Sequence, residues 1–185
     1  SCFAASSQGL VISQVYGAGG NAGATYQADF VELFNQTTSP ISLSGYSVQY
    51  ASAAGTSWSK SDLPAVTLQS GQYFLLQMSS AGANGIALPT PDATATPQIA
   101  MSATAGKVAL VNSTTALTGT QCPPPFVASI VDYVGFGSTA NCFEGSGPTP
   151  NAASSAASLV RATNGCTDNN DNATDFSSAI ALARN

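Results

Sequence analysis

The sequence predicts an all-β domain folded as a β-sandwich. Short runs rich in β-branched and aromatic residues recur along the 185-residue chain, and clusters of Gly, Pro, Asn and Ser separate them. No stretch of useful length has apolar residues at the spacing of three to four positions that a helix requires. Many short strands between turn residues are typical of a sandwich, in which two sheets share one core.

Strand-like segments follow one another along most of the chain. The runs 29–35 and 72–78 are apolar at most positions, which predicts central strands with both faces largely covered. Apolar and polar residues alternate in 46–50, so one face of that strand is expected to be buried. Trp58 is expected to anchor the core from a short strand. In chain order, the predicted strands are 10–16, 29–35, 46–50, 56–60, 66–69, 72–78, 106–112, 128–135 and 158–161.

Long irregular loops are predicted in two places. The stretch 79–97 is rich in Ala, Gly, Pro and Thr and shows no periodicity, which favours a surface loop. Beyond Gly137, regular structure is expected to thin out apart from the last predicted strand.

Glu32 is the one acidic residue inside the apolar part of the run 29–35. A buried carboxylate needs a cation or several hydrogen-bond donors, because an unpaired buried charge costs several kcal/mol. Lys60 and Lys107 are expected at strand edges and Arg184 lies near the end of the chain, which leaves Arg161, flanked by apolar residues in the last predicted strand. The sequence therefore predicts a partly buried ion pair between Glu32 and Arg161.

The composition excludes some functions. Charged residues make up 7% of the chain, and its four basic residues are scattered, so neutralising the phosphates of a nucleic acid is not expected. Ser, Thr, Ala, Asn and Gly fill the positions that charged residues usually occupy. A neutral polar surface of this kind is common in secreted, surface-layer and fibre-forming proteins.

Cysteine usage and the start of the chain favour an extracellular location. The four cysteines have no CxxC spacing, and the chain has no histidine to help bind a metal, so disulfides in an oxidising compartment are expected. Residues 1–8 resemble a mature N-terminal segment that follows a removed signal, and residues 9–185 are expected to form one domain. No apolar run approaches the length of about 20 residues that spans a membrane.

The residue inventory argues against an enzyme. Without histidine the chain has no Ser–His or Cys–His nucleophile pair and no ordinary base for neutral pH. Asp29 and Glu32 could be a pair of glycosidase carboxylates, but three positions apart on a strand they point to opposite faces.

Oxygen-bearing side chains near the C-terminus form a candidate calcium loop. Asp168, Asn170 and Asn172 alternate, and Asp175 follows closely. The glycine and glutamate that an EF-hand would require are replaced by alanines, so an EF-hand is excluded and another calcium site stays open. The preferred interpretation is a turn, anchored by a disulfide, in which these side chains bind backbone donors. No other cofactor is expected.

Three sequons mark candidate glycosylation sites. They lie at Asn35, Asn112 and Asn172. A chain so rich in Ser, Thr and Asn contains about this number by chance, so the sequons carry little information by themselves.

A series of blocks carries a resemblance over nearly the whole chain. In order, the blocks are 10–17, 29–35, 43–50, 68–74, 131–137, 141–145 and 165–176. Together they resemble the bacterial and archaeal secreted branch of the lamin tail domain family. The resemblance implies an immunoglobulin-like β-sandwich without catalytic residues of its own. In this branch the domain is found alone, repeated, or fused to secreted nucleases and phosphatases.

The same blocks imply a disulfide between Cys142 and Cys166, which would pin the irregular C-terminal segment to the sandwich. Cys2 is then left to pair with Cys122. Cys2 lies outside the family pattern, so two alternatives stay open for it: lipidation, and a bond to a neighbouring subunit.

Two functions are compatible with these observations. The first is a secreted structural domain that packs with copies of itself into a cell-surface or extracellular fibre. The second is a targeting or binding module for a glycan, polymer or protein, working with secreted enzymes such as nucleases. Its candidate stacking residues are Tyr16, Tyr26, Tyr46, Tyr50 and Trp58.

Overall fold

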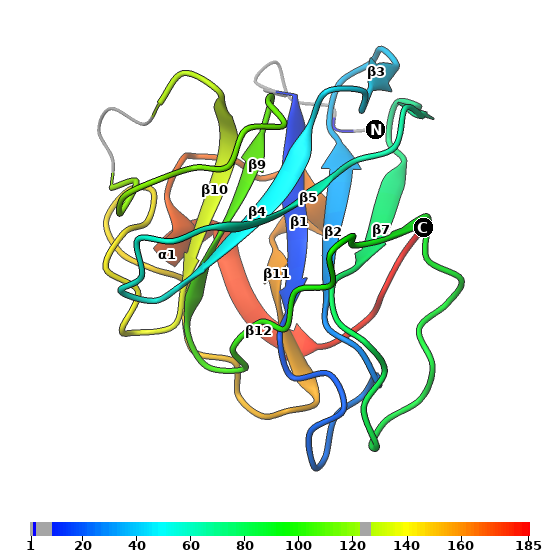
Figure 1. Cartoon of the computed structure of the whole chain (residues 1–185), viewed down its shortest axis with the longest axis vertical. Coiled ribbons are helices and arrows are strands. Elements are labelled where there is room, and N and C mark those ends of the chain that lie inside the picture. The colour runs from blue at the N-terminus through cyan, green and yellow to red at the C-terminus, as the bar shows by residue number, and fades with distance from the viewer. Residues whose placement is uncertain (1, 3–8, 123–126) are drawn as a thin grey trace.

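Two β-sheets pack face to face in the computed structural model, which describes residue 2, residues 9–122 and residues 127–185 (Figure 1). Neighbouring strands are antiparallel except β7 and β8, which are parallel. The six-stranded sheet has the order β12-β11-β1-β2-β7-β8, with β1 Leu10–Tyr16, β2 Phe30–Asn35, β7 Tyr73–Gln77, β8 Ala93–Thr94, β11 Ala157–Arg161 and β12 Phe176–Ile180. The four-stranded sheet has the order β10-β9-β4-β5, with β4 Ser47–Ser52, β5 Ser59–Asp62, β9 Gly106–Val111 and β10 Ile130–Phe136.

Small elements complete the fold. Strands β3 Ile41–Ser42 and β6 Thr67–Leu68 pair with each other at one end of the sandwich. A 3-10 turn, η1 Thr163–Gly165, follows β11, and one helical turn, α1 Asn172–Asp175, leads into β12. No helix in the described ranges is long and apolar enough to cross a membrane.

The main core lies between the two sheets. Alternate residues of each strand point into it, such as Val31 and Leu33 from β2 and Val108 and Leu110 from β9. The intervening residues of β2, which include Glu32, therefore face away from the second sheet. This alternation decides where each charged side chain goes.

The outer face of the six-stranded sheet is covered by the end of the chain. After β12, the chain runs toward β7, as the red segment in Figure 1 shows. Ala181 and Ala183 pack there against Tyr16 and Phe30, which point outward from β1 and β2. Both faces of β2 are thus buried, as its composition predicted.

The structure confirms the all-β, immunoglobulin-like prediction and most of its strands. Trp58 lies just before β5 and is 8% exposed, and its ring N–H donates to the Gly119 carbonyl (2.9 Å), so it is a core anchor. The loop 79–97 is irregular except for β8. β12 and α1 were not predicted. Apart from Cys2, the expected N-terminal segment 1–8 lies outside the described residues.

Candidate functional site

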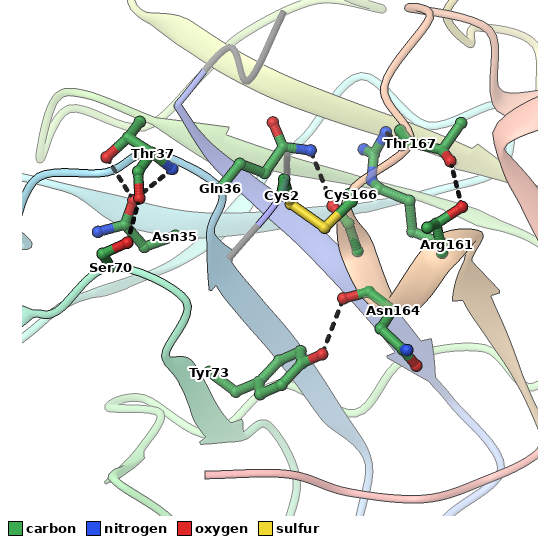
Figure 2. Close-up of a disulfide and its surroundings, with 12 residues drawn as sticks. Cys2, Asn35, Gln36, Thr37, Ser70, Tyr73, Arg161, Asn164, Cys166 and Thr167 are labelled. Atoms are coloured by element: carbon green, nitrogen blue, oxygen red, sulfur yellow. Dashed lines mark hydrogen bonds between the residues drawn. A yellow bond between two sulfur atoms is a disulfide. The ribbon is translucent and has the colours of Figure 1, made fainter. Parts of the chain in front are cut away.

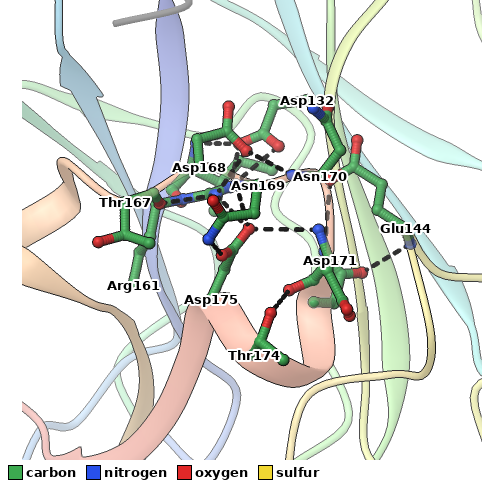
Figure 3. Close-up of polar contacts among 12 residues, drawn as sticks. Asp132, Glu144, Arg161, Thr167, Asp168, Asn169, Asn170, Asp171, Thr174 and Asp175 are labelled. Carbon is green, nitrogen blue, oxygen red and sulfur yellow. Dashed lines mark hydrogen bonds and ion pairs between the residues drawn. The ribbon is translucent and has the colours of Figure 1, made fainter. Parts of the chain in front are cut away.

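Five acidic and basic side chains gather where β10, β11 and the loop before β12 meet (Figure 3). We call this group the Arg161 cluster, and its members are Asp132, Glu144, Arg161, Asp168 and Asp175. Arg161 points from β11 toward the side of the sandwich, where β1 lies against β10. The group contains the densest collection of carboxylates in the described residues, so it is the first place to look for chemistry.

The guanidinium of Arg161 uses all of its donor nitrogens. Its Nη2 donates to both oxygens of Asp132 (2.9 and 2.7 Å), and its Nε donates to the Ile12 carbonyl (2.9 Å). Its Nη1 contacts Asp168 Oδ1 (3.1 Å) and lies 3.7 Å from Asp175 Oδ2. Although burial lowers the pKa of Arg161, the carboxylates around it raise that pKa more. The side chain is therefore a permanent, fully paired cation.

Glu144 belongs to the cluster but does not bond Arg161. It lies beside Asp132, and its closest hydrogen-bond donor is Asn172 Nδ2, 3.4 Å from Oε2. Burial raises the pKa of Glu144 to about 9, and the negative charge of Asp132 adds to this shift. Near neutral pH, Glu144 is therefore protonated and adds no charge to a group that is already rich in carboxylates.

Oxygens of Asp132, Glu144 and Asp168 lie within 4.8 Å of one another, close enough to ligate one cation. Two of these three residues, however, already bond Arg161. The guanidinium supplies the positive charge that a metal ion would bring. The cluster thus has the properties of a structural ion-pair network.

The four predicted calcium ligands do not converge on one point. Asn172 Oδ1 accepts from the Gly135 and Glu144 amides (2.8 and 3.1 Å), which ties α1 to β10. Asp175 accepts from the Asn169 amide (2.8 Å), while Asp168 bonds Arg161. Asn170 is exposed in the left-handed region, with φ 53°. This loop has the backbone-capping turn structure that the sequence analysis preferred, and calcium binding stays a prediction that the geometry does not favour.

The predicted ion pair between Glu32 and Arg161 is wrong. Glu32 is fully buried, but it points outward from the six-stranded sheet, whereas Arg161 shares the inward face with Leu159. The partner of Glu32 is Arg184, whose Nη2 lies 2.7 Å from Oε1. Residues 181–185 fold back over the outer face and bring this cation with them.

We call the second charged site the Glu32 latch; it joins Ser13, Gln14, Glu32 and Arg184. A register shift in β1 between Ile12 and Gln14 brings Ser13 and Gln14 next to Glu32. Ser13 Oγ donates to Glu32 Oε1 (2.6 Å), and the Arg184 backbone amide donates to Oε2 (2.8 Å). Gln14 Nε2 donates to the carbonyl of Leu182 (2.8 Å), and the guanidinium of Arg184 stacks 3.9 Å from the Tyr73 ring. The latch therefore fastens the end of the chain to the sheet.

Lys107 does not lie at a strand edge, as the sequence analysis expected, but is fully buried on the outer face of the four-stranded sheet. Its Nζ donates to the Gly55 carbonyl (2.7 Å) and to Asn141 Oδ1 (2.9 Å). Burial lowers the pKa of Lys107. The ammonium group ties two loops to β9.

The disulfides connect different cysteines from those that the family resemblance implied. Cys2 pairs with Cys166, and Cys122 pairs with Cys142, so the expected Cys142–Cys166 and Cys2–Cys122 bonds are wrong. β1 and β11 are antiparallel neighbours, so the N-terminal end of β1 lies beside the C-terminal end of β11, where Cys2 meets Cys166. Figure 2 shows this bond beside Gln36, whose Nε2 donates to the Gly165 carbonyl (2.8 Å).

The second disulfide has an equally local cause. After β10, a turn sends the chain back, and the Asn141 amide donates to the Ala53 carbonyl (3.0 Å). Cys142 is then buried in the cluster that contains Trp58, where the loop after β9 passes. Cys122 lies on that loop.

Two of the three predicted glycosylation sites are excluded in the folded domain. Asn35 is buried, and its Nδ2 donates to the Ser39 and Leu68 carbonyls (2.9 and 3.0 Å). Asn172 is buried as well, with its Nδ2 on the Tyr133 carbonyl (2.9 Å). Asn112 is exposed and stays a predicted site.

The candidate stacking residues do not form a binding platform. Tyr16, Tyr26 and Trp58 are buried in the clusters that cover the outer faces of the two sheets. Tyr46 and Tyr50 are half-buried against the main core. Their aromatic surface is used for packing.

Asp132 and Glu144 were missed by sequence reasoning. Asp132 had the signal that singled out Glu32, because it is one carboxylate inside the apolar run 130–136. Glu144 carries no such signal, since it lies in a loop of small residues.

Comparison with known proteins identifies the class of this domain. Residues 4–122 match the lamin tail domain family, so the chain belongs to that family. A DUF4876 family protein from Bacteroides thetaiotaomicron has a similar fold, with a TM-score of 0.59 over 95% of this chain and 72% of that chain, at 12% identity. At that identity the likeness concerns the fold alone. No curated protein matches the sequence.

Proposed function

We propose that this chain is a secreted, non-catalytic structural domain that associates with copies of itself into a cell-surface or extracellular assembly. The observation that carries the proposal is the internal use of its charge. In the described ranges, each buried Asp, Glu, Lys or Arg side chain bonds another group of the domain: Asp29, Glu32, Lys107, Asp132, Glu144, Arg161 and Asp175. Such groups hold the fold together, so few acidic or basic side chains remain free to react with a substrate.

The surface supports the same proposal. A hollow lined by Thr104, Ser138, Thr139 and Asn151 contains neutral side chains only, so it offers no acid or base. Among the described residues, large apolar side chains are exposed instead, with Ile180 at 69%, Leu182 at 66% and Ile86 at 65%. Exposed apolar groups on a nearly uncharged surface favour contacts between proteins.

The two disulfides fit an oxidising compartment, which supports secretion. A surface with few charges promotes association between copies of a protein, and an extracellular assembly requires such association. The alternative, a targeting or ligand-binding module, has less support because its candidate aromatic residues are buried or half-buried in packing contacts.

The test is a concentration series of the purified, fully oxidised protein, followed by static light scattering and negative-stain electron microscopy. We expect particles heavier than the 18.5 kDa monomer, and regular assemblies at high concentration. A monomer at every concentration would refute the proposal. Retention of the monomer by a glycan or polymer array would favour the binding module instead.

A further inference from the structure

The edge strands of the two sheets differ in how well they are protected from pairing with a further strand. At one edge of the four-stranded sheet, β5 carries the exposed ion pair of Lys60 and Asp62 (2.6 Å). At the other edge, the outward groups of β10 are occupied, because the Gly135 amide bonds Asn172 and its carbonyl accepts from Thr149 (2.9 Å). Charge and coverage are the usual means by which a sheet edge avoids pairing with another strand.

β12 forms one edge of the six-stranded sheet and carries no charge, and in the described residues the loop before β11 bonds it only through the Ala153 amide, which donates to the hydroxyl of Ser178 (2.9 Å) and not to its backbone. The Ala162 amide donates to the Asp175 carbonyl, and the Ala181 amide donates to the Ala156 carbonyl. Because hydrogen-bonded pairs alternate along an antiparallel ladder, Ser178 and Ile180 point their N–H and C=O groups away from β11. No described group forms a hydrogen bond with the backbone N–H or C=O of Ser178 or of Ile180. The edge is therefore a free template for one more strand.

The side chains of this edge are neutral and partly apolar. Residues 176–183 contain no charged residue, in a chain whose formal net charge is −5. Ile180 and Leu182 are exposed, and Ser177 and Ala179 are small and exposed. This edge therefore carries no charge that would repel a second copy of the chain.

We propose that β12 pairs antiparallel with β12 of a second copy, so that the two six-stranded sheets become continuous. This inference rests on the proposed self-association and names the surface that carries it. A two-fold axis beside Ala179 places Ser178 opposite Ile180 of the second copy, and each such pair exchanges both of its backbone hydrogen bonds. Ile180 is then covered at the contact.

A second copy fits this edge better than an unrelated partner does. The strand is short and carries no charge that would select a partner of opposite charge. The same residues on both sides satisfy each other under two-fold symmetry, which is what an isologous contact requires.

Two variants of one residue test the pairing. Ile180→Lys places a charge on each side of the contact. Ile180→Pro removes an outward N–H that β11 does not use, so the monomer should keep its fold. Ile86→Lys is the matched control, because Ile86 is exposed to nearly the same extent and the change in net charge is identical.

Sedimentation equilibrium of the full chain measures the dissociation constant, and the unfolding midpoint checks the fold of each variant. We expect both Ile180 variants to weaken dimer formation by about tenfold or more, and Ile86→Lys to leave it within about twofold. If the wild-type chain associates but the Ile180 variants associate equally well, the edge assignment is wrong while self-association stands. If the wild-type chain stays monomeric, the proposed function fails as well.

Discussion

The two arginine sites of this domain differ in how many carboxylates surround the guanidinium. In the Glu32 latch, one guanidinium faces one carboxylate, and the Arg184 side chain keeps 20% of its surface exposed. In the Arg161 cluster, one guanidinium with no exposed surface faces Asp132, Asp168 and Asp175, with Glu144 close by. The latch is balanced and close to water, whereas the cluster is deeply buried and rich in acid. The first should act mainly as a fastener, and the second should make the stability of the fold depend on pH.

Removing the cation of the cluster should have the largest effect. Arg161→Met leaves Asp132 and Asp168 buried without their counter-charge and leaves the Ile12 carbonyl without its donor. We expect the free energy of unfolding to fall by about 4 kcal/mol near neutral pH, as measured by urea denaturation.

Arg161→Lys is the matched control for this variant. It keeps the charge but cannot bind both oxygens of Asp132 from one planar group, so its loss should be intermediate. A loss for Arg161→Met no larger than that for breaking the latch would contradict the comparison.

Breaking the latch should cost less, because Arg184 can turn toward water. Glu32→Gln keeps the shape of the side chain but removes the charge that Arg184 and Ser13 bind. We expect a loss of about 2 kcal/mol in the free energy of unfolding.

The double variant Glu32→Gln with Arg184→Met checks the origin of that loss. Its total should be smaller than the sum of the two single losses, because no unpaired charge is left. An unchanged unfolding midpoint for Glu32→Gln would show that the latch carries no stability.

The effect of Glu144 differs from the other two because it depends on pH, and it should grow as the pH rises. The pKa of this carboxyl lies at about 9 in the folded chain and has an ordinary value of 4.5. Between these values the folded state holds a proton that the unfolded state has released. The contribution of Glu144 is therefore fully present at acidic pH and is lost as the pH rises, by at most about 1.4 kcal/mol per pH unit.

Glu144→Gln removes that proton equilibrium and keeps the size of the side chain. We expect the unfolding free energy of the wild type, relative to this variant, to decline steadily with rising pH in urea titrations. Burial also raises the pKa of Asp29, but both chains share that contribution. Parallel pH profiles for the two chains would mean that folding does not raise the pKa of Glu144. The cluster would then have to contain a further positive charge.

The sequence predicted what alternation and composition control. Apolar runs located the central strands, and the isolated carboxylate of Glu32 correctly indicated a buried charge that needs a cation. The choice of cation was wrong because it depends on contacts between distant segments. Because side chains alternate along a strand, Glu32 points to the outer face of the sheet while Val31 and Leu33 point into the core. No local feature of the sequence indicates that residues 181–185 return across that outer face.

The cysteine pairs and the C-terminal elements were missed for related reasons. Cys2 and Cys166 are 164 positions apart and meet because β1 and β11 are neighbours in the sheet. α1 has four residues, too few for helical periodicity to show. β12 is a half-polar edge strand, so it lacks the apolar run that revealed the central strands.

Self-association through a surface without charge can be tested directly. Sedimentation velocity of the oxidised wild-type chain should be measured over a wide concentration range, in both low and high salt. We expect the average sedimentation coefficient to rise with concentration by a similar amount in both salts, because the buried charges serve the fold and the contact edge is neutral. A single 18.5 kDa species at all concentrations, or association that high salt abolishes, would contradict the account.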